Sequence, residues 1–324
     1  MEYAAVIRNY GTADVMVCES VEVTSPGVGE IKVRHTHIGV NYHDIYVRSG
    51  AYQTLQLPGI PGLEAAGVVE KVGDEVTGFS VGDRVVYIDS GYGSYASARL
   101  LSADLAVRLP DSISSEIAAA SFLRGLTVQI LLEITSIHPG AWVLIHAAAG
   151  GVGQLLVQKA LSIGVHVIGA VGSEEKVELL HQIGCKHVIV YRDVDFSHKV
   201  RELTGGRGVD VVYDSVGKDT YEASMKSLAS RGKFVIFGQA SGAVPLLDVS
   251  TLAKGSLTVT RPVMFHYIQE RKDLDQLSNM LFADIHSGVI QLRSPIEFSL
   301  KDCSKAHLLL ESRKAIQPLV LRVD

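Results

Sequence analysis

From about residue 122 to 264, short apolar runs alternate with stretches of helical periodicity. Runs rich in Val, Ile and Leu are typical of buried parallel strands, and apolar residues at a spacing of three or four indicate helices between them. The strands are predicted at 142–147, 165–170, 187–190, 209–214, 232–237 and 256–260. The pattern therefore predicts an α/β fold with a doubly wound six-stranded parallel sheet, whose ligand binds at the carboxyl ends of the strands.

The helices of this region are predicted mainly between the first five strands, for example at 154–163, 174–183 and 221–228. The link from the fifth to the sixth strand, residues 239–255, is less clearly helical. Glycine 164 follows the first of these helices and offers a stop signal there.

Residues 1–121 have a different pattern, with short strands and frequent turns. Glu30 to His35 alternates polar and apolar residues, as a half-buried strand does, and two further strands run through 66–73 and 81–87. These features predict a compact β barrel or sandwich. The C-terminal tail is again mixed, with helices at 274–287 and 301–312 and strands at 296–298 and 319–321. Because the six-stranded sheet is already complete, we expect residues 265–324 to join residues 1–121 in one domain, with 122–264 as the other.

A glycine-rich turn, His146 to Gly153, connects the first strand of the predicted parallel sheet to its helix. In this context Gly150 lets the backbone approach a pyrophosphate, and Gly153 lets the helix pack closely on the strand. The N–H groups at the helix start would face the negative charge. The first glycine of the G-x-G-x-x-G pattern is replaced by Ala148. A tight turn without a ligand is the alternative interpretation.

The end of the second strand indicates which dinucleotide would bind. The chain continues Val171-Gly172-Ser173-Glu174-Glu175-Lys176, so no carboxylate stands at the strand end where it would repel a 2′-phosphate. Ser173 and Lys176 can donate a hydrogen bond and a charge to that phosphate, which favours NADPH. Glu174 and Glu175 suit the start of a helix. Lys176 as a plain surface lysine, and Tyr191 as a core tyrosine instead of an adenine contact, are the alternatives.

Composition and charge narrow the class of protein. The chain has 324 residues, 47% of them hydrophobic and 20% charged, which is typical of a soluble globular protein of two domains. The net charge of −5 gives no reason to expect nucleic acid as a partner. We expect no membrane span, because polar residues and glycines interrupt every apolar run, and the first six residues lack the features of a signal peptide. A cytoplasmic protein is predicted.

Neither the cysteines nor the histidines predict a metal site. Cys18, Cys185 and Cys303 are widely separated and form no C-x-x-C pair, so we interpret them as buried or indifferent free thiols. His35 and His37 share one face of a predicted strand, with His43 close behind. No carboxylate or thiol completes a ligand set, and no bound metal is expected.

At seven places the sequence resembles the zinc-independent quinone oxidoreductases related to ζ-crystallin, within the medium-chain dehydrogenase/reductase superfamily. The resemblance covers the whole length and rests on matching segments in the right order, at 39–44, 46–50, 61–67, 121–127, 146–153, 212–217 and 258–262. It implies a GroES-like catalytic domain formed by residues 1–121 and 265–324, around an NADPH-binding Rossmann domain at 122–264. The family binds its cofactor in the cleft between the two domains.

The resemblance also implies roles for individual residues. Asn41, Asp44 and Tyr46 would line the nicotinamide and substrate end. The other implied cofactor contacts are Thr127 near the carboxamide, Gly151 and Val152 at the pyrophosphate, Ser173, Lys176 and Tyr191 at the adenosine phosphate, and Ser215, Phe237, Gly238 and Arg261 along the remaining surface.

The same comparison bears on zinc. Zinc-dependent relatives place a catalytic Cys where this chain has Asn41, and a His-Glu pair where it has Leu63-Glu64. An amide is a poor zinc ligand and leucine is none, so oxidation of an alcohol by a zinc mechanism is not expected.

The resemblance implies transfer of a hydride from NADPH to a quinone. Asn41 and Tyr46 would hydrogen-bond a carbonyl oxygen as negative charge builds on it. Tyr52 would flank the pocket, unless it is an ordinary exposed tyrosine. Two other functions stay open. One is reduction of an enone C=C bond, and the other is a nucleotide-sensing, RNA-binding or structural role without turnover. The net negative charge argues against RNA as a partner, and the retained cofactor residues argue against a role without turnover.

Self-association is expected through the last strand of the parallel sheet, residues 256–260. This strand would be a sheet edge that can pair with its copy. The family resemblance also implies a homodimer.

Overall fold

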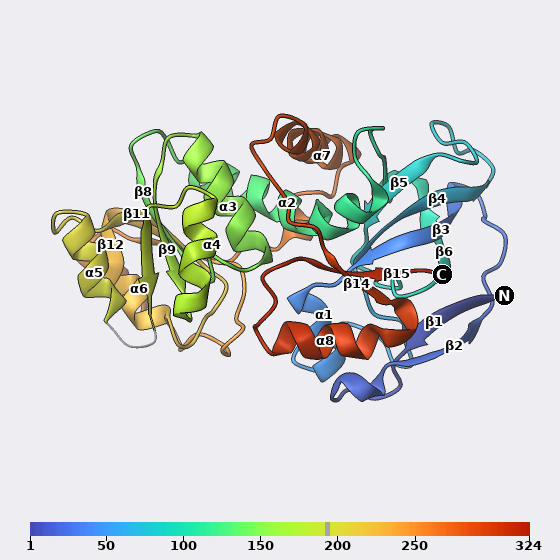
Figure 1. Ribbon diagram of the computed structural model, residues 1–324, viewed down its shortest axis with the longest axis horizontal. Coiled ribbons are helices and arrows are strands. Elements are labelled where there is room, and N and C mark those ends of the chain that lie inside the picture. The colour runs from blue at the N-terminus through green and yellow to red at the C-terminus, as the bar shows by residue number, and fades with distance from the viewer. Residues whose placement is uncertain (192–194) are drawn as a thin grey trace. The chain divides into compact units, whose positions relative to one another are not determined.

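The chain folds into two units in the computed structural model, which describes residues 1–191 and 195–324 (Figure 1). The first unit comprises Met1–Arg124, Glu270–His286 and Leu292–Asp324. The second comprises Gly125–Gln269 and Ser287–Gln291. The short return segment is held in the second unit by Gln158, whose side chain exchanges hydrogen bonds with the backbone of Gln291 at 2.9 and 3.2 Å.

The second unit is built on a parallel sheet of six strands, in the order β10-β9-β8-β11-β12-β13. The doubly wound sheet expected from the apolar runs is therefore confirmed. The strands are β8 (Trp142–Ile145), β9 (His166–Val171), β10 (His187–Val190), β11 (Val209–Asp214), β12 (Leu228–Ile236) and β13 (Thr258–Thr260). Figure 1 shows the helix α3 beside β8 and β9.

Buried aliphatic and aromatic residues of neighbouring strands and helices form the core of the second unit. Leu144, Ile168, Val212 and Phe234 are all fully buried within it. The helices that cover the sheet are α3 (Gly151–Ser162), α4 (Val177–Gln182), α5 (Phe196–Leu203) and α6 (Tyr221–Ser227), with short 3-10 helices η3 (Glu174–Lys176), η4 (Val249–Lys254) and η5 (Met264–His266). Residues 239–255 contain only η4, in keeping with their weak helical pattern.

Several boundaries differ from those predicted, and at two of them a residue with a positive φ turns the chain. Strand β8 ends at Ile145 instead of residue 147, because Ala147 has a φ of 47° and turns the chain. Strand β13 begins at Thr258 instead of residue 256, where Ser256 has a φ of 50°. The helix predicted at 174–183 is divided into η3 and α4.

The first unit is organised around β3 (Glu30–Gly39), which pairs with β4, β6 and β15 in a seven-stranded sheet. The sheet order is β14-β15-β3-β4-β5-β7, and β6 pairs with β3 off this path. Strands β1 and β2 form a separate antiparallel pair. The strands are β1 (Glu2–Val6), β2 (Val17–Val21), β4 (Glu64–Val72), β5 (Arg84–Ile88), β6 (Ala98–Ser102), β7 (Ala106–Arg108), β14 (Ile296–Ser299) and β15 (Leu319–Arg322).

The C-terminal tail completes the first unit's sheet. Strand β15 runs antiparallel to β3, with Leu321 opposite Ile38. The helices of this unit are α1 (Tyr42–Ser49), α7 (Arg271–His286) and α8 (Cys303–Glu311), with 3-10 helices η1 (Ala13–Val15), η2 (Ala103–Leu105) and η6 (Leu300–Asp302).

Helix α2 (Ser115–Thr135) carries the chain from the first unit into the second. Its length of 21 residues and a window of mean hydropathy 1.5 make it long and apolar enough to cross a membrane, by length and composition alone. However, 72% of that window is buried inside the protein, which is the pattern of a core helix.

Candidate functional site

The turn between β8 and α3 brings backbone N–H groups to the carboxyl end of the sheet. Gly150 is the residue before α3, with a φ of −79° and a ψ of 175°, and the helix begins at Gly151. A Cβ on Gly153 would lie 2.3 Å from the carbonyl oxygen of Ala147, so only glycine allows this close approach of helix and turn. The first N–H groups of a helix have no partner within it, and here they are available to an anion.

The residues predicted to select the cofactor follow β9 directly. Ser173 has extended backbone angles just before η3, and Lys176 is the last residue of η3. Glu174 and Glu175 lie exposed in the first turn of that helix. The strand itself ends in Val171 without a carboxylate.

Tyr191 lies beside the same strand end. Its backbone N–H donates to the carbonyl of Val171 at 3.1 Å. Its ring meets Phe196 and His146 edge-on, with centroids 6.5 and 6.2 Å away. The side chain is half-buried. It packs like a core tyrosine on one side and is accessible on the other, as an adenine contact would need to be.

A buried carboxylate holds the loop after β11. The side chain of Asp214 accepts hydrogen bonds from the backbone of Val216 at 2.6 Å and Gly217 at 3.0 Å, and from the hydroxyl of Thr220 at 2.6 Å. Asp214 is fully buried. These contacts define the loop that presents Ser215 at the carboxyl edge of the sheet.

The neighbouring strand end is fitted closely to this loop. The backbone N–H of Phe237 donates to the carbonyl of Asp214 at 2.9 Å. A Cβ on Gly238 would lie 2.8 Å from the carbonyl oxygen of Ser215. Ser215, Phe237 and Gly238 are therefore brought together, as expected from neighbouring parallel strands.

Two further predicted cofactor residues lie elsewhere in the second unit. Thr127 is on α2, and its hydroxyl contacts the sulfur of Met264 at 3.9 Å. Arg261 follows β13 and donates from Nη2 to Oε1 of Gln239 at 3.0 Å.

In the first unit, Asn41 begins helix α1 at the end of β3. Its backbone N–H donates to Oδ2 of Asp44 at 2.8 Å, and its side-chain Nδ2 donates to Oε1 of Glu64 at 2.6 Å. Oε2 of Glu64 accepts the backbone N–H of Leu123 at 2.7 Å. Both oxygens of Glu64 thus accept hydrogen bonds, and this carboxylate fixes the orientation of the Asn41 amide.

Asp44 continues the network towards α8. The hydroxyl of Tyr95 donates to Oδ2 of Asp44 at 3.2 Å and contacts Nε2 of His307 at 2.9 Å. All three side chains are fully buried. A hydrogen-bonded chain therefore runs from the start of α1 to the middle of α8.

Burial dominates the acid–base properties of these carboxyls. It raises the pKa of Asp44 to about 7, with a further contribution from nearby Glu64. It also raises the pKa of Glu64 to about 7, against the hydrogen bonds from Asn41 and Leu123. The buried guanidinium of Arg124 lowers both pKa values but does not cancel the effect of burial. Both groups would therefore change charge near neutral pH.

An aromatic cluster covers the outer side of α1. The rings of Tyr46 and Tyr52 lie with centroids 4.8 Å apart, and Tyr42 meets Tyr46 edge-on at 5.2 Å. His43 contacts Tyr52 at 5.4 Å and reaches the hydroxyl of Tyr92 with Nε2 at 3.2 Å. Tyr52 is half-buried within this cluster, and not an ordinary exposed tyrosine.

The site prediction missed the residues that hold Asn41 and Asp44 in place. Glu64 was noted only in connection with zinc, and neither Tyr95 nor His307 was singled out. A glutamate directly before the apolar run at 65–69 is an unusual signal, and it could have identified Glu64 as a buried polar group. Nothing local marks Tyr95 or His307.

The histidines that were considered and rejected as metal ligands have other partners. Nδ1 of His35 contacts the carbonyl of Ala96 at 2.7 Å, and Nε2 contacts the hydroxyl of Tyr87 at 2.9 Å. His37 lies 3.6 Å from Glu297. Within residues 1–191 and 195–324, no group of three or more His, Cys, Asp or Glu side chains could hold a metal ion.

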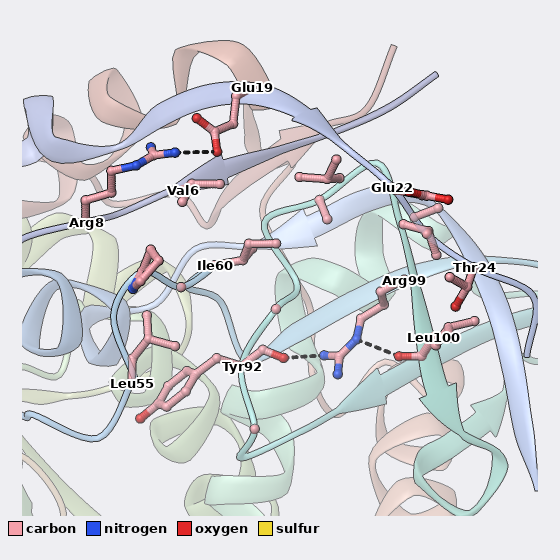
Figure 2. Close-up of a pocket in the computed structure, with 18 residues that line it drawn as sticks. Val6, Arg8, Glu19, Glu22, Thr24, Leu55, Ile60, Tyr92, Arg99 and Leu100 are labelled. Atoms are coloured by element: carbon pink, nitrogen blue, oxygen red, sulfur yellow. Dashed lines mark hydrogen bonds and ion pairs between the residues drawn. The ribbon is translucent and has the colours of Figure 1, made fainter. Parts of the chain in front are cut away.

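A surface groove of about 610 Å³ lies in the first unit (Figure 2). Asn41 and Asp44 are not among the residues that line it. Arg8 and Glu19 form an ion pair of 2.9 Å at one side of it, and Arg99 contacts the carbonyls of Tyr92 and Leu100 at another. Tyr92 connects the groove to the aromatic cluster, because its hydroxyl contacts Nε2 of His43 at 3.2 Å.

Two family models match the chain. The alcohol dehydrogenase GroES-like domain matches residues 27–111, and the model described as zinc-binding dehydrogenase matches residues 151–282. The first match identifies the strand-rich unit as GroES-like. The second covers five strands of the parallel sheet, β9 to β13, but not positions 41, 63 and 64, where zinc ligands would stand.

Curated proteins and solved structures resemble the chain over nearly its whole length. Quinone oxidoreductase 1 of Escherichia coli is 47% identical over 92% of the chain and 93% of its own length. A 2-haloacrylate reductase of a Burkholderia species is 43% identical over 99% of both proteins. The crystal structure of E. coli quinone oxidoreductase in complex with NADPH has a TM-score of 0.95 at 43% identity, covering 99% of both chains.

These similarities agree with the local features of the site. The glycine turn, the strand ends and the replacement of zinc ligands by Asn41 and Leu63 occur together in one chain. The protein therefore belongs to the zinc-independent quinone oxidoreductase family of the medium-chain dehydrogenase/reductase superfamily.

Proposed function

We propose that the protein is an NADPH:quinone oxidoreductase that works without a metal ion. The observation that carries this proposal is the side chain of Asn41. Where zinc-dependent relatives have a thiolate, this chain has an amide that is buried and oriented by Glu64 at 2.6 Å. Such an amide is suited to donate a hydrogen bond to a carbonyl and not to bind zinc.

The residues at the carboxyl edge of the parallel sheet fit a phosphorylated dinucleotide. A Cβ at Gly153 would meet the backbone, so helix α3 can begin close to the turn and offer its first N–H groups to a pyrophosphate. Ser173 and Lys176 supply a donor and a positive charge where NAD-dependent relatives have a carboxylate. We assign the pyrophosphate to Gly150, Gly151, Val152 and Gly153, and the 2′-phosphate to Ser173, Lys176 and Tyr191.

The remaining cofactor residues keep the roles implied by the family. Thr127, Ser215, Phe237, Gly238 and Arg261 would border the rest of the dinucleotide, with Asn41, Asp44 and Tyr46 at the nicotinamide end. NADPH, when bound, supplies the hydride that reduces the acceptor.

The protein's own part in the reaction is to orient the acceptor and stabilise developing charge. One Nδ2 hydrogen of Asn41 is given to Glu64, and the second is directed to the acceptor oxygen. The hydroxyl of Tyr46 is a second donor. The rings of Tyr46 and Tyr52 supply an apolar, half-buried surface that suits a planar quinone and excludes water.

Steady-state assays with a panel of acceptors test this function. We expect oxidation of NADPH by 1,4-quinones, unaffected by a chelator, with NADPH preferred to NADH. In Lys176→Ala the KM for NADPH should rise about tenfold or more, because a charge-assisted contact to the phosphate is lost, while the KM for NADH should change little. Lys186→Ala, which removes another lysine of the same unit, is the matched control.

Two results would contradict the proposal. Activity that is lost with chelator and restored by zinc would show that a metal takes part. Tight binding of NADPH without its oxidation by any acceptor would favour a nucleotide-sensing role.

A second candidate is reduction of a C=C bond conjugated to a carbonyl group. The 2-haloacrylate reductase supports it, because that relative matches this chain at 43% identity over 99% of its length and its name describes such an acceptor. The same donors at Asn41 and Tyr46 would serve an enone. Rates for enones and quinones measured side by side would distinguish the two functions.

We further propose that the protein acts in the cytoplasm as a homodimer joined through β13. Within the described parts of the chain, β13 pairs with β12 alone, so its other edge can take a second strand. The three cysteines of the protein are free thiols, as is usual in a reducing compartment such as the cytoplasm.

A further inference from the structure

The fold brings together two cysteines that are far apart in the sequence. Cys18 is in the second strand of the chain, β2, and Cys303 is the first residue of α8. Both belong to the first unit, where Figure 1 shows α8 in red near the blue strands β1 and β2. The interpretation of all three cysteines as indifferent thiols did not foresee this pair.

Cys18 lies beside the start of α8. The carbonyl oxygen of Leu300 accepts the backbone N–H of Cys303 and is 3.5 Å from the Cys18 thiol. A hydrogen bond with Cys303 lowers the pKa of Cys18 to about 7, and the positive charge of Lys301 contributes, against the effects of burial and of Asp302. The same contact and burial raise the pKa of Cys303 well above its usual range.

Cys18 is both the more acidic and the more accessible of the two thiols. Cys18 is partly exposed, whereas Cys303 is only 1% exposed. A partly exposed thiol that ionises near neutral pH reacts with an oxidant, and a buried thiol beside it can then displace the product.

We propose that Cys18 and Cys303 are a site of reversible oxidation, at which hydrogen peroxide closes a disulfide between β2 and α8. The pair is not part of the proposed NADPH and quinone site.

The reaction balances with peroxide as the two-electron oxidant. The Cys18 thiolate attacks one peroxide oxygen, so that an S–O bond forms, the O–O bond breaks and hydroxide leaves to become water. The Cys303 sulfur then attacks the sulfur of Cys18, the S–S bond forms and the S–O bond breaks. The departing hydroxide takes the Cys303 proton as a second water. A dithiol reductant reverses the process by thiol–disulfide exchange.

Cys185 provides an internal control. It is fully buried in the second unit, where burial raises its pKa to about 11. Its thiol contacts the backbone carbonyls of Val167 and His187. It should therefore stay reduced under conditions that oxidise Cys18.

The test treats the full-length reduced protein with hydrogen peroxide, alkylates the remaining thiols and maps the peptides without reduction. We expect one linked pair, the peptides of Cys18 and Cys303, with Cys185 fully alkylated. Dithiothreitol should separate the pair. The linked protein should melt several degrees higher than the reduced protein, because the cross-link closes a long loop of the unfolded chain.

Three results would overturn the proposal. They are alkylation of Cys18 and Cys303 after peroxide treatment, oxidation of Cys18 to the sulfinic acid while Cys303 stays free, or reaction of Cys185 as fast as Cys18. In Cys303→Ser we expect Cys18 to stop at the sulfenic acid, which a dimedone probe would capture. Because the mapping is done on the unsubstituted protein, it decides the question even if that variant fails to fold.

Discussion

At the scale of single residues, Glu64 orients the amide of Asn41 in the proposed acceptor site. Its two carboxylate oxygens accept from Asn41 and from the backbone of Leu123. Added bulk at Gly39 is excluded, because a Cβ there would lie 2.2 Å from Oε1 of Glu64. Because Glu64 can only accept, the amide of Asn41 must turn its NH2 group, and not its oxygen, towards Glu64.

Glu64→Gln tests this arrangement. The backbone N–H of Leu123 must keep an acceptor, so the new amide would turn its NH2 group towards Asn41 and make the Asn41 amide flip. An oxygen would then replace the donor that faces the acceptor. We expect kcat/KM for quinones to fall by about a hundredfold with little change in the melting temperature, as when a preorganised donor is removed.

The pH profile gives a second readout for the same variant. The raised pKa means that Glu64 gains a proton as the pH falls through about 7, and the neutral carboxyl then holds its two donors less strongly. We expect kcat/KM of the unsubstituted protein to decrease below pH 7, and this inflection to be weakened in Glu64→Gln. The control is Glu70→Gln on the same strand, where the carboxylate pairs with Lys32 at 2.9 Å. An equal loss in both variants would contradict the positioning role.

At the scale of secondary-structure elements, the approach of α3 to the β8 turn shapes the dinucleotide site. Gly153 lies one helical turn after Gly150, and its missing side chain makes room for the carbonyl of Ala147. Ala147 itself has a φ of 47°, a conformation that residues with a side chain adopt at some cost in free energy. The turn is thus tightly constrained by its packing.

Gly153→Ala should separate α3 from this turn. With a Cβ 2.3 Å from a backbone oxygen, the helix must move, and we expect the free energy of unfolding to fall by about 1–3 kcal/mol. The affinity for NADPH, measured by calorimetry, should fall together with it, because the N–H groups of α3 no longer reach the pyrophosphate. Gly27→Ala is the control, since its Cβ would meet only a flexible Glu30 side chain at 3.4 Å. Unchanged NADPH affinity in Gly153→Ala would rule out this role for the turn.

At the scale of the whole molecule, the exposed edge of β13 bears on assembly. The strand has three residues and pairs with β12 through Thr258, Val259 and Thr260. A strand edge of this kind is usually protected by a charge, a covering segment or a second copy of the chain. Thr258 is exposed and uncharged.

Light scattering should therefore give twice the mass of one chain, which is 34.9 kDa. Two lysines brought together across a twofold axis would repel, so Thr258→Lys should shift the protein towards the monomer. Val17→Lys, at a position 52% exposed on β2, should leave the mass unchanged. A monomeric mass for the unsubstituted protein would remove this proposal.

Local patterns were sufficient to predict most of the elements. Buried parallel strands are continuous apolar runs, and helices repeat every three to four residues, so the six strands of the second unit could be placed before any packing was known. The turn at Gly150 and Gly153 and the absence of a carboxylate after Val171 are likewise local. Boundary errors occurred where backbone torsion ended a strand early, at Ala147, or delayed the start of a strand, at Ser256.

The chemistry of the first unit depends on contacts between residues distant in sequence. Asn41 lies 23 residues from Glu64, and Tyr95 lies 212 residues from His307, so no spacing rule links them. The approach of Cys303 to Cys18 and the shifted pKa values of Asp44 and Glu64 also arise only when strands and α8 pack together and exclude water. The sequence by itself determined the elements and the dinucleotide turn, because those depend on neighbouring residues. The tertiary structure decided which polar groups share a buried environment, because burial is a property of the packed chain.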